Sequence, residues 1–174
     1  MCFVFVMILK PPDLILAPKA LAHKPKWVRE DRNNLVLACP VAVRGVVLEG
    51  AQVRMTALHH RPDEAITFQL EYLRPLHKFR PACRIEWRPL HGHNNKGAGP
   101  FEYRYREIKG SHHHAFEYNW LTETEEMRSG NLPVAVPIVP DPDDFESLLD
   151  FVGQALRITG MGLVDPPPCE GVFL

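Results

Sequence analysis

Cysteine is scarce, and its spacing excludes the usual cysteine-based sites. The four cysteines stand at positions 2, 39, 83 and 169. No two of them form a C-x-x-C pair, which argues against a zinc knuckle and gives no sign of a disulfide framework. We therefore expect reduced thiols and a cytoplasmic protein, with Cys83 as a small core residue.

Long apolar runs are also missing. The opening run MCFVFVMIL covers nine residues, about half of the length that a membrane-spanning helix needs. It has no basic segment before it, and Lys10-Pro11-Pro12 ends it abruptly, so it fits a signal peptide poorly. We expect no membrane contact. Residues 1–44 are interpreted as an N-terminal arm or edge strand, and residues 45–174 as a single domain.

The sequence contains neither a Walker motif nor a dinucleotide-binding glycine pattern, and it has no H-E-x-x-H pair. No compact set of metal ligands is therefore visible. From these absences we expect no stoichiometric zinc and no other cofactor.

The net charge of −1 hides an uneven distribution. Residues 74–109 carry nine Lys and Arg against three Asp and Glu, whereas residues 110–174 carry two against eleven. The simpler interpretation is that the basic and acidic parts neutralise each other. The alternative is that the basic part binds a polyanion such as RNA.

Alternation of apolar and polar residues predicts a series of strands. The runs lie at 51–58, 66–73, 83–88, 102–109 and 112–120. The first two are joined by the turn Arg61-Pro62-Asp63-Glu64 and predict a β-hairpin.

Two helices are expected after these strands. Apolar residues at 145, 148, 149, 152 and 156 form one helical stripe, preceded by acids that suit the start of a helix. A capping-box spacing predicts a second helix over 122–130. The fold class is therefore α+β, an antiparallel sheet of about four to five strands followed by a packed C-terminal helix.

Histidines concentrate between residues 91 and 114. His112 and His114 are two residues apart, so on a regular strand their imidazoles share one face and His113 takes the other. His91 and His93 form a second H-x-H pair in a glycine-rich loop.

Three interpretations of this cluster remain open. The first is acid–base cleavage of RNA, in which imidazoles exchange protons and nearby cations stabilise the phosphorane. The second is a divalent metal site with Glu86 or Glu117 as an added ligand. The third is that the histidines are purely structural.

Part of the chain resembles a known family. The segments CRIEWRPLHGHNN and GSHHHAFEYNW, within residues 82–120, are similar to a pattern in small bacterial TumE-like toxins and other proteins of toxin–antitoxin modules. The matching positions are those of a strand with Arg84, Ile85 and Glu86, a loop with His91 or His93 and Asn94 or Asn95, and a second strand. In this second strand they are His112, His114 and Phe116. This resemblance implies a cytoplasmic protein that cleaves RNA and has a small antitoxin protein as its partner.

The leading hypothesis from the sequence is a metal-independent, histidine-dependent ribonuclease-like protein. The alternative is a non-catalytic module that binds protein or nucleic acid through a basic sheet face. The candidate catalytic residues are His112, His114, His91 and His93. The candidate substrate-binding residues are Arg84, Arg88, Lys109 and Asn94.

Overall fold

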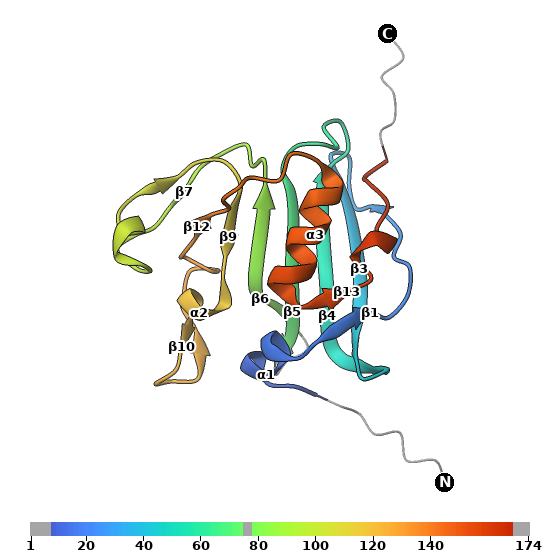
Figure 1. The fold of residues 1–174 in the computed structure, drawn as a ribbon, viewed down its shortest axis with the longest axis horizontal. Coiled ribbons are helices and arrows are strands. Elements are labelled where there is room, and N and C mark those ends of the chain that lie inside the picture. Colours follow the sequence, from blue (N-terminus) through green and yellow to red (C-terminus); the bar gives the residue numbers. More distant parts are fainter. Residues whose placement is uncertain (1–7, 75–77, 169–174) are drawn as a thin grey trace.

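A computed structural model describes residues 8–74 and 78–168, so most of the apolar run at residues 1–9 lies outside the described residues. The described part is built on a nine-stranded, mainly antiparallel sheet (Figure 1). Its strand order is β12-β9-β6-β5-β4-β3-β1-β13, with β2 beside β3. The sheet strands are β1 (Lys19–Leu21), β2 (Val28–Arg29), β3 (Asn34–Val43), β4 (Val46–Leu58), β5 (Ile66–Arg74), β6 (Lys78–Trp87), β9 (His112–His114), β12 (Val136–Pro137) and β13 (Ile158–Thr159).

The shorter elements lie outside this sheet. They are the helices α1 (Pro11–Leu16), α2 (Phe116–Asn119) and α3 (Phe145–Leu156), the hairpin strands β7 (His93–Asn94), β8 (Glu107–Ile108), β10 (Trp120–Leu121) and β11 (Glu126–Met127), and the 3₁₀ turns η1 (Phe101–Tyr103) and η2 (Met161–Leu163). None of the described helices is long and apolar enough to cross a membrane.

The centre of the sheet follows the alternation in the sequence. β4 and β5 pair antiparallel, with Val53 opposite Leu70 and Met55 opposite Phe68. All four side chains are fully buried, because every second residue of a strand points to the same face. The predicted hairpin is therefore confirmed. Cys83 lies in the same core on β6, as expected.

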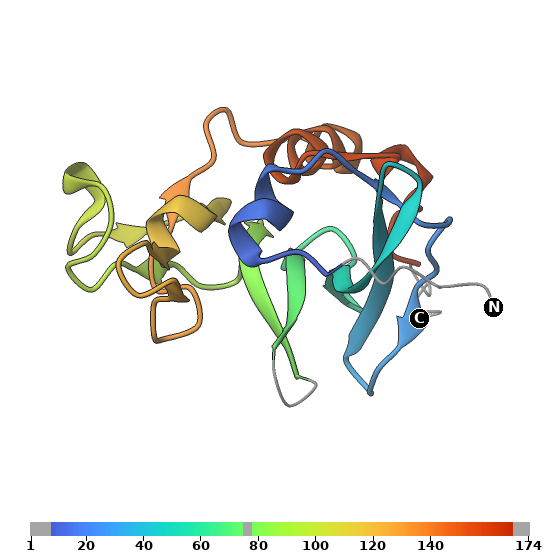
Figure 2. The same cartoon turned by 90° about the horizontal axis from the view of Figure 1, so that it is seen from below.

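Helix α3 covers one face of the sheet, as seen from two directions in Figures 1 and 2. Its predicted stripe packs into the core through four buried residues: Leu148, Leu149, Val152 and Leu156. Burying each such side chain contributes roughly 1.5–3 kcal/mol to folding. Asp144 begins the helix by accepting a hydrogen bond from the Ser147 backbone N–H, so this acid is structural, as the sequence indicated.

The sheet is larger than predicted. Residues 19–43, part of the segment expected to form an arm, supply β1, β2 and β3. β1 pairs with β3 on one side and runs parallel to β13 on the other. The buried Lys19 lies at the start of β1, where its ammonium group donates hydrogen bonds to the carbonyls of Leu14, Ile15 and Ala17. It thus binds free carbonyls at the end of α1.

Two predicted strands are present only in part, and one predicted helix is absent. The strand expected at 102–109 is interrupted by η1 and by Tyr105, whose φ of 57° is incompatible with an extended strand, leaving only β8. The strand expected at 112–120 stops after His114, and α2 follows. The helix expected at 122–130 is instead a turn between β10 and β11, with Glu125 at a positive φ.

Candidate metal centre

The pairing of β9 with β6 places four polar side chains side by side. His112 lies opposite Glu86 and His114 opposite Arg84. Strand alternation directs these four side chains away from α3. His113 lies between them in the sequence but points the other way, and its ring contacts that of Phe151 on α3 at a centroid distance of 6.1 Å. The division of the histidines predicted from the sequence is therefore confirmed.

A third imidazole comes from a separate hairpin. His93 lies on β7, which pairs with β8. Its ring centroid is 4.6 Å from that of His114 and 5.8 Å from that of His112. One potential ligand nitrogen from each of the three rings lies within 4.8 Å of the others. We call His93, His112 and His114 the histidine cluster.

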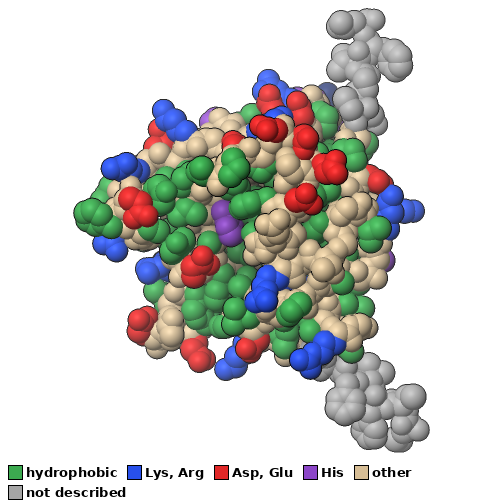
Figure 3. All heavy atoms as spheres, viewed as in Figure 1, with side chains coloured by type: hydrophobic (Ala, Val, Ile, Leu, Met, Phe, Trp, Pro, Cys, Tyr) green, Lys and Arg blue, Asp and Glu red, His purple; other side chains and the backbone are tan. Residues whose placement is uncertain are grey.

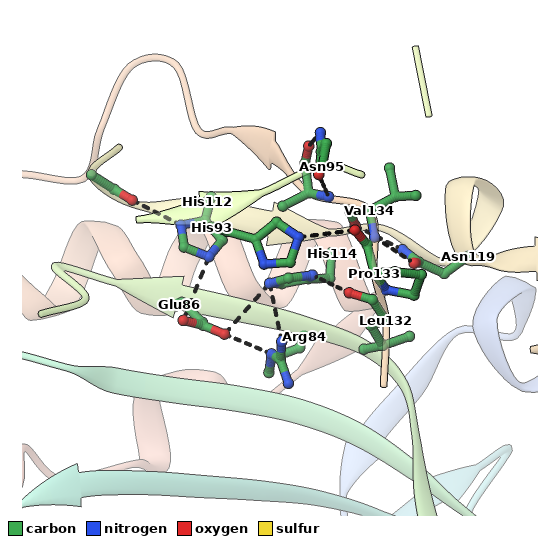
Figure 4. Close-up of polar contacts among 12 residues, drawn as sticks. Arg84, Glu86, His93, Asn95, His112, His114, Asn119, Leu132, Pro133 and Val134 are labelled. Carbon is green, nitrogen blue, oxygen red and sulfur yellow. Dashed lines mark hydrogen bonds and ion pairs between the residues drawn. The ribbon is translucent and has the colours of Figure 1, made fainter. Parts of the chain in front are cut away.

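Each ring of the histidine cluster is held by a backbone carbonyl (Figure 4). His112 Nδ1 lies 2.9 Å from the Gly110 oxygen, His114 Nδ1 lies 2.7 Å from that of Leu132, and His93 Nε2 lies 2.9 Å from that of Pro133. A carbonyl oxygen can only accept, so each of these nitrogens carries the hydrogen. The other nitrogen of each neutral ring therefore presents a lone pair, which is the form that a metal ion binds.

Two buried asparagines hold the segment that supplies two of these carbonyls. Asn119 pairs through its amide with both backbone groups of Val134. Asn95 does the same with Ala135. Both side chains are fully buried. These bonds hold the backbone of Val134 and Ala135, and so they also fix the carbonyls of the two residues before them, Leu132 and Pro133.

Glu86 and Arg84 complete the polar group. Glu86 lies 3.5 Å from His112 Nε2 and 3.4 Å from His114 Nε2, and one of its oxygens lies 2.7 Å from Arg84 Nε. Arg84 Nη2 is 3.2 Å from His114 Nε2. Burial alone would raise the pKa of Glu86. The charge of Arg84 opposes that effect, and the pKa of the carboxyl lies below its ordinary value.

Burial keeps members of the histidine cluster neutral. It lowers the pKa of His114 to about 4 and also lowers the pKa of His93. Neutral imidazole is the form required of a metal ligand. Among the described residues, the buried His112 Nε2 has no strict hydrogen bond, and its contact is the Glu86 carboxylate at 3.5 Å.

The cluster is enclosed but lies between two surface pockets. His112 and His114 are 1% and 0% exposed. His93 lines a pocket of about 480 Å³, whereas Glu86 lines a smaller one of about 190 Å³. On the face that carries α3, histidine contributes only small areas of surface (Figure 3). One member of the cluster, His93, thus borders the first pocket, and the carboxylate beside the other two rings borders the second.

The remaining predicted site residues lie around this centre or away from it. His91 is exposed and lines the smaller pocket beside Glu86, and Asn94 lines the larger one. Arg88 stacks on Trp87 at 4.1 Å and donates to the carbonyl of Asp143. Lys109 is 81% exposed and lies 3.6 Å from Glu107. The structure does not bring Arg88 or Lys109 to the histidine cluster.

Sequence reasoning missed the residues that orient the rings. The carbonyls of Gly110, Leu132 and Pro133 are backbone groups, so no residue type in the sequence indicates their role. Asn119 is a buried polar side chain, and its amide type is the one feature that could have pointed to this support. Comparisons of this chain with protein-family models, with curated proteins and with solved structures found no match.

Proposed function

We propose that the histidine cluster binds one divalent transition-metal ion, with zinc as the best fit, and that the ion makes this protein a metal-dependent hydrolase. Three imidazole ligands leave a fourth position open for water, an arrangement typical of catalytic rather than structural zinc sites. A bound ion of this kind lowers the pKa of its water and supplies a nucleophile near neutral pH.

One observation carries the proposal. All three rings pair one nitrogen with a backbone carbonyl, and one potential ligand nitrogen from each ring lies within 4.8 Å of the others. Outer-shell carbonyls of this kind fix the tautomer and direction of metal-binding histidines. Histidines that serve only packing have no need for three converging lone pairs.

Glu86 supports the same reaction class. Its carboxylate faces two of the imidazoles and is 24% exposed at the smaller pocket. From that position it is suited to accept a proton from an attacking water. Arg84 neutralises the carboxylate until the cation is bound.

Burial favours this proposal over direct acid–base cleavage by His112 and His114. Both rings are enclosed, so an RNA strand has no direct contact with them. A general acid with a pKa of about 4, as for His114, would carry almost no proton near pH 7.

The metal-independent ribonuclease is the second candidate. It is favoured by the shared face of His112 and His114 and by Arg84 within 3.2 Å of the His114 ring. In that mechanism the rings exchange protons and the guanidinium stabilises phosphorane charge, after an opening movement of the β7–β8 hairpin.

Metal analysis of the purified protein tests the first proposal. We expect about one zinc per chain after dialysis, as for a single mononuclear site. His93→Ala, His112→Ala and His114→Ala should each abolish this retention. His91→Ala is the matched control, because His91 is exposed and outside the cluster. His113→Ala is a second control on the opposite strand face, and it should keep the zinc.

Chelation then distinguishes the two candidates. If the wild-type protein retains no zinc, and cleaves a mixed RNA equally well with and without EDTA, the metal proposal fails and the acid–base candidate gains support. Loss of zinc in His91→Ala as well as in the cluster variants would place the ion elsewhere. Circular dichroism of every variant separates these outcomes from unfolding.

A further inference from the structure

The larger pocket beside His93 has a composition suited to an anion. Its lining combines the cations Lys96 and Arg128 with polar groups from Asn94 and Ser129, and it includes no aspartate or glutamate. Among the described residues, neither Lys96 nor Arg128 forms an ion pair. Two unpaired cations in one concave site attract negative charge.

Arg128 is held in position for such a ligand. Its Nε donates to the Tyr118 carbonyl at 3.0 Å, and its own backbone N–H donates to the Asn119 carbonyl at 2.7 Å. The bond from Nε leaves the terminal nitrogens of the guanidinium available. A guanidinium fixed in this way binds phosphate oxygens in the bidentate geometry that lysine cannot offer.

The pocket connects directly to the histidine cluster. His93 lines it, and Pro133, whose carbonyl accepts the His93 N–H, lines it too. A ligand in this pocket therefore lies next to one of the proposed metal ligands. Apolar walls from Ala98 and Leu121 complete a volume of about 480 Å³, within the usual range for small-molecule sites of about 300–1,000 Å³.

From these observations we infer that the pocket binds the phosphate group of a nucleotide-sized phosphoester, with Arg128 and Lys96 as its phosphate-binding residues. We further infer that this phosphoester is the substrate, and that step rests on the proposed metal-dependent hydrolase. The phosphate site itself rests on the pocket alone. The nucleotide could be free or the end of an RNA strand, because both present the same phosphate and a planar base.

Binding measurements on metal-loaded and EDTA-treated full-length protein test the inference. Isothermal titration calorimetry with inorganic phosphate, AMP and a short oligoribonucleotide compares the possible ligands. Lys96→Gln and Arg128→Gln should each weaken phosphate and AMP binding by about tenfold or more, the usual effect of losing a charged hydrogen-bond partner. Arg128→Lys should restore only part of the affinity.

Lys26→Gln is the matched control. Lys26 is exposed and precedes β2, which lies on β3, at the opposite side of the sheet from β9. Its replacement removes the same charge and should leave binding unchanged. Binding of AMP but not of the oligoribonucleotide would identify a free nucleotide, and tighter binding of the oligoribonucleotide would identify an RNA end.

The result that overturns the inference is distinct from failure of the metal proposal. If neither phosphate nor AMP binds, or if both bind equally well to wild type, Lys96→Gln and Arg128→Gln, the pocket is not a phosphate site. If zinc is absent but binding still depends on Lys96 and Arg128, the phosphate site stands and only the metal-dependent hydrolase is lost. Lys96 is exposed, so its variant tests the site even if Arg128→Gln does not fold.

Discussion

The side chain of Asn119 pairs with Val134 as a neighbouring strand would. Its Nδ2 donates to the Val134 carbonyl at 2.9 Å, and its Oδ1 accepts from the Val134 N–H at 3.0 Å. Val134 directly follows Leu132 and Pro133, whose carbonyls bind the rings of His114 and His93. A residue with no contact to the histidine cluster thus fixes two of its three imidazoles.

We therefore predict that Asn119→Ala destabilises the fold and weakens metal binding together. Loss of these bonds leaves buried backbone groups unpaired, at a cost of about 2–4 kcal/mol in the free energy of unfolding. Because two rings lose their orientation, zinc affinity should fall about 10–100-fold. Urea denaturation and competition with a chromogenic chelator measure the two effects.

Asn33→Ala is the control, because Asn33 is exposed in the turn before β3. Its stability should change by less than about 0.5 kcal/mol. An Asn119→Ala protein that is destabilised but binds zinc with wild-type affinity would contradict the orienting role.

The sequence predicted the strand-borne part of the site and left open which of the two loop histidines joins it. Alternation is a local property, so the common face of His112 and His114 followed from their spacing alone. Which histidine of the pair at 91 and 93 joins them depends on the β7–β8 pairing and on contacts with residues 133–135. The β7–β8 pairs are 13 and 15 positions apart and the contacts with residues 133–135 are 40 apart, so neither leaves a periodic pattern in the sequence.

The errors in the fold have the same origin. The stripe of α3 specifies one helix because a single face must be buried. At 122–130 the capping-box spacing was outweighed by pairing between Trp120 and Met127. At 102–109, Tyr105 adopts a left-handed conformation, and its N–H donates to the Asn95 carbonyl at 2.8 Å. Its ring lies against Gly97, where an added Cβ would lie 2.6 Å from the tyrosine hydroxyl. Local propensity is a weak predictor where such contacts dominate.

A second prediction concerns the alkaline pH dependence of stability. Burial lowers the pKa of Lys19 from 10.5 to about 8, with Arg157 adding to the effect and Cys83 opposing it. The folded state therefore binds fewer protons than the unfolded state between these values, so stability should increase as the pH rises from about 8. The slope is at most about 1.4 kcal/mol per pH unit.

Cys83 should reverse this trend at higher pH. Burial raises the pKa of its thiol from 9.0 to about 12, so above pH 9 the unfolded state loses a proton that the folded state keeps, and stability should decrease. Urea denaturation from pH 7 to 11 should thus show a rise from pH 8 to 9, a plateau to about pH 10.5 where the two effects cancel, and a decrease above it. Lys19→Met should remove the rise, and Cys83→Ala should extend it toward pH 10.5. A wild-type curve that falls steadily from pH 8 would contradict the prediction.

The last prediction separates the charge of Glu86 from its place in the fold. Glu86→Gln keeps the size of the side chain but leaves the positive charge of Arg84 uncompensated, 3.2 Å from the His114 ring. That charge repels an incoming cation, so zinc affinity should fall about 10–100-fold, the usual effect of losing an outer-shell partner. Loss of the ion pair should also lower the free energy of unfolding by about 1–3 kcal/mol. Glu71→Gln is the control, because Glu71 is a buried acid, as Glu86 is in part, and accepts a hydrogen bond from Gln52 on the neighbouring strand. It should lower stability and leave zinc affinity unchanged. Equal loss of zinc affinity in both variants would show that affinity follows stability and not the charge beside the rings.

Removing the cation as well, in Glu86→Gln combined with Arg84→Met, should restore much of the affinity if repulsion by Arg84 is the cause. A double variant as weak as the single one would instead identify the carboxylate itself as a ligand of the ion.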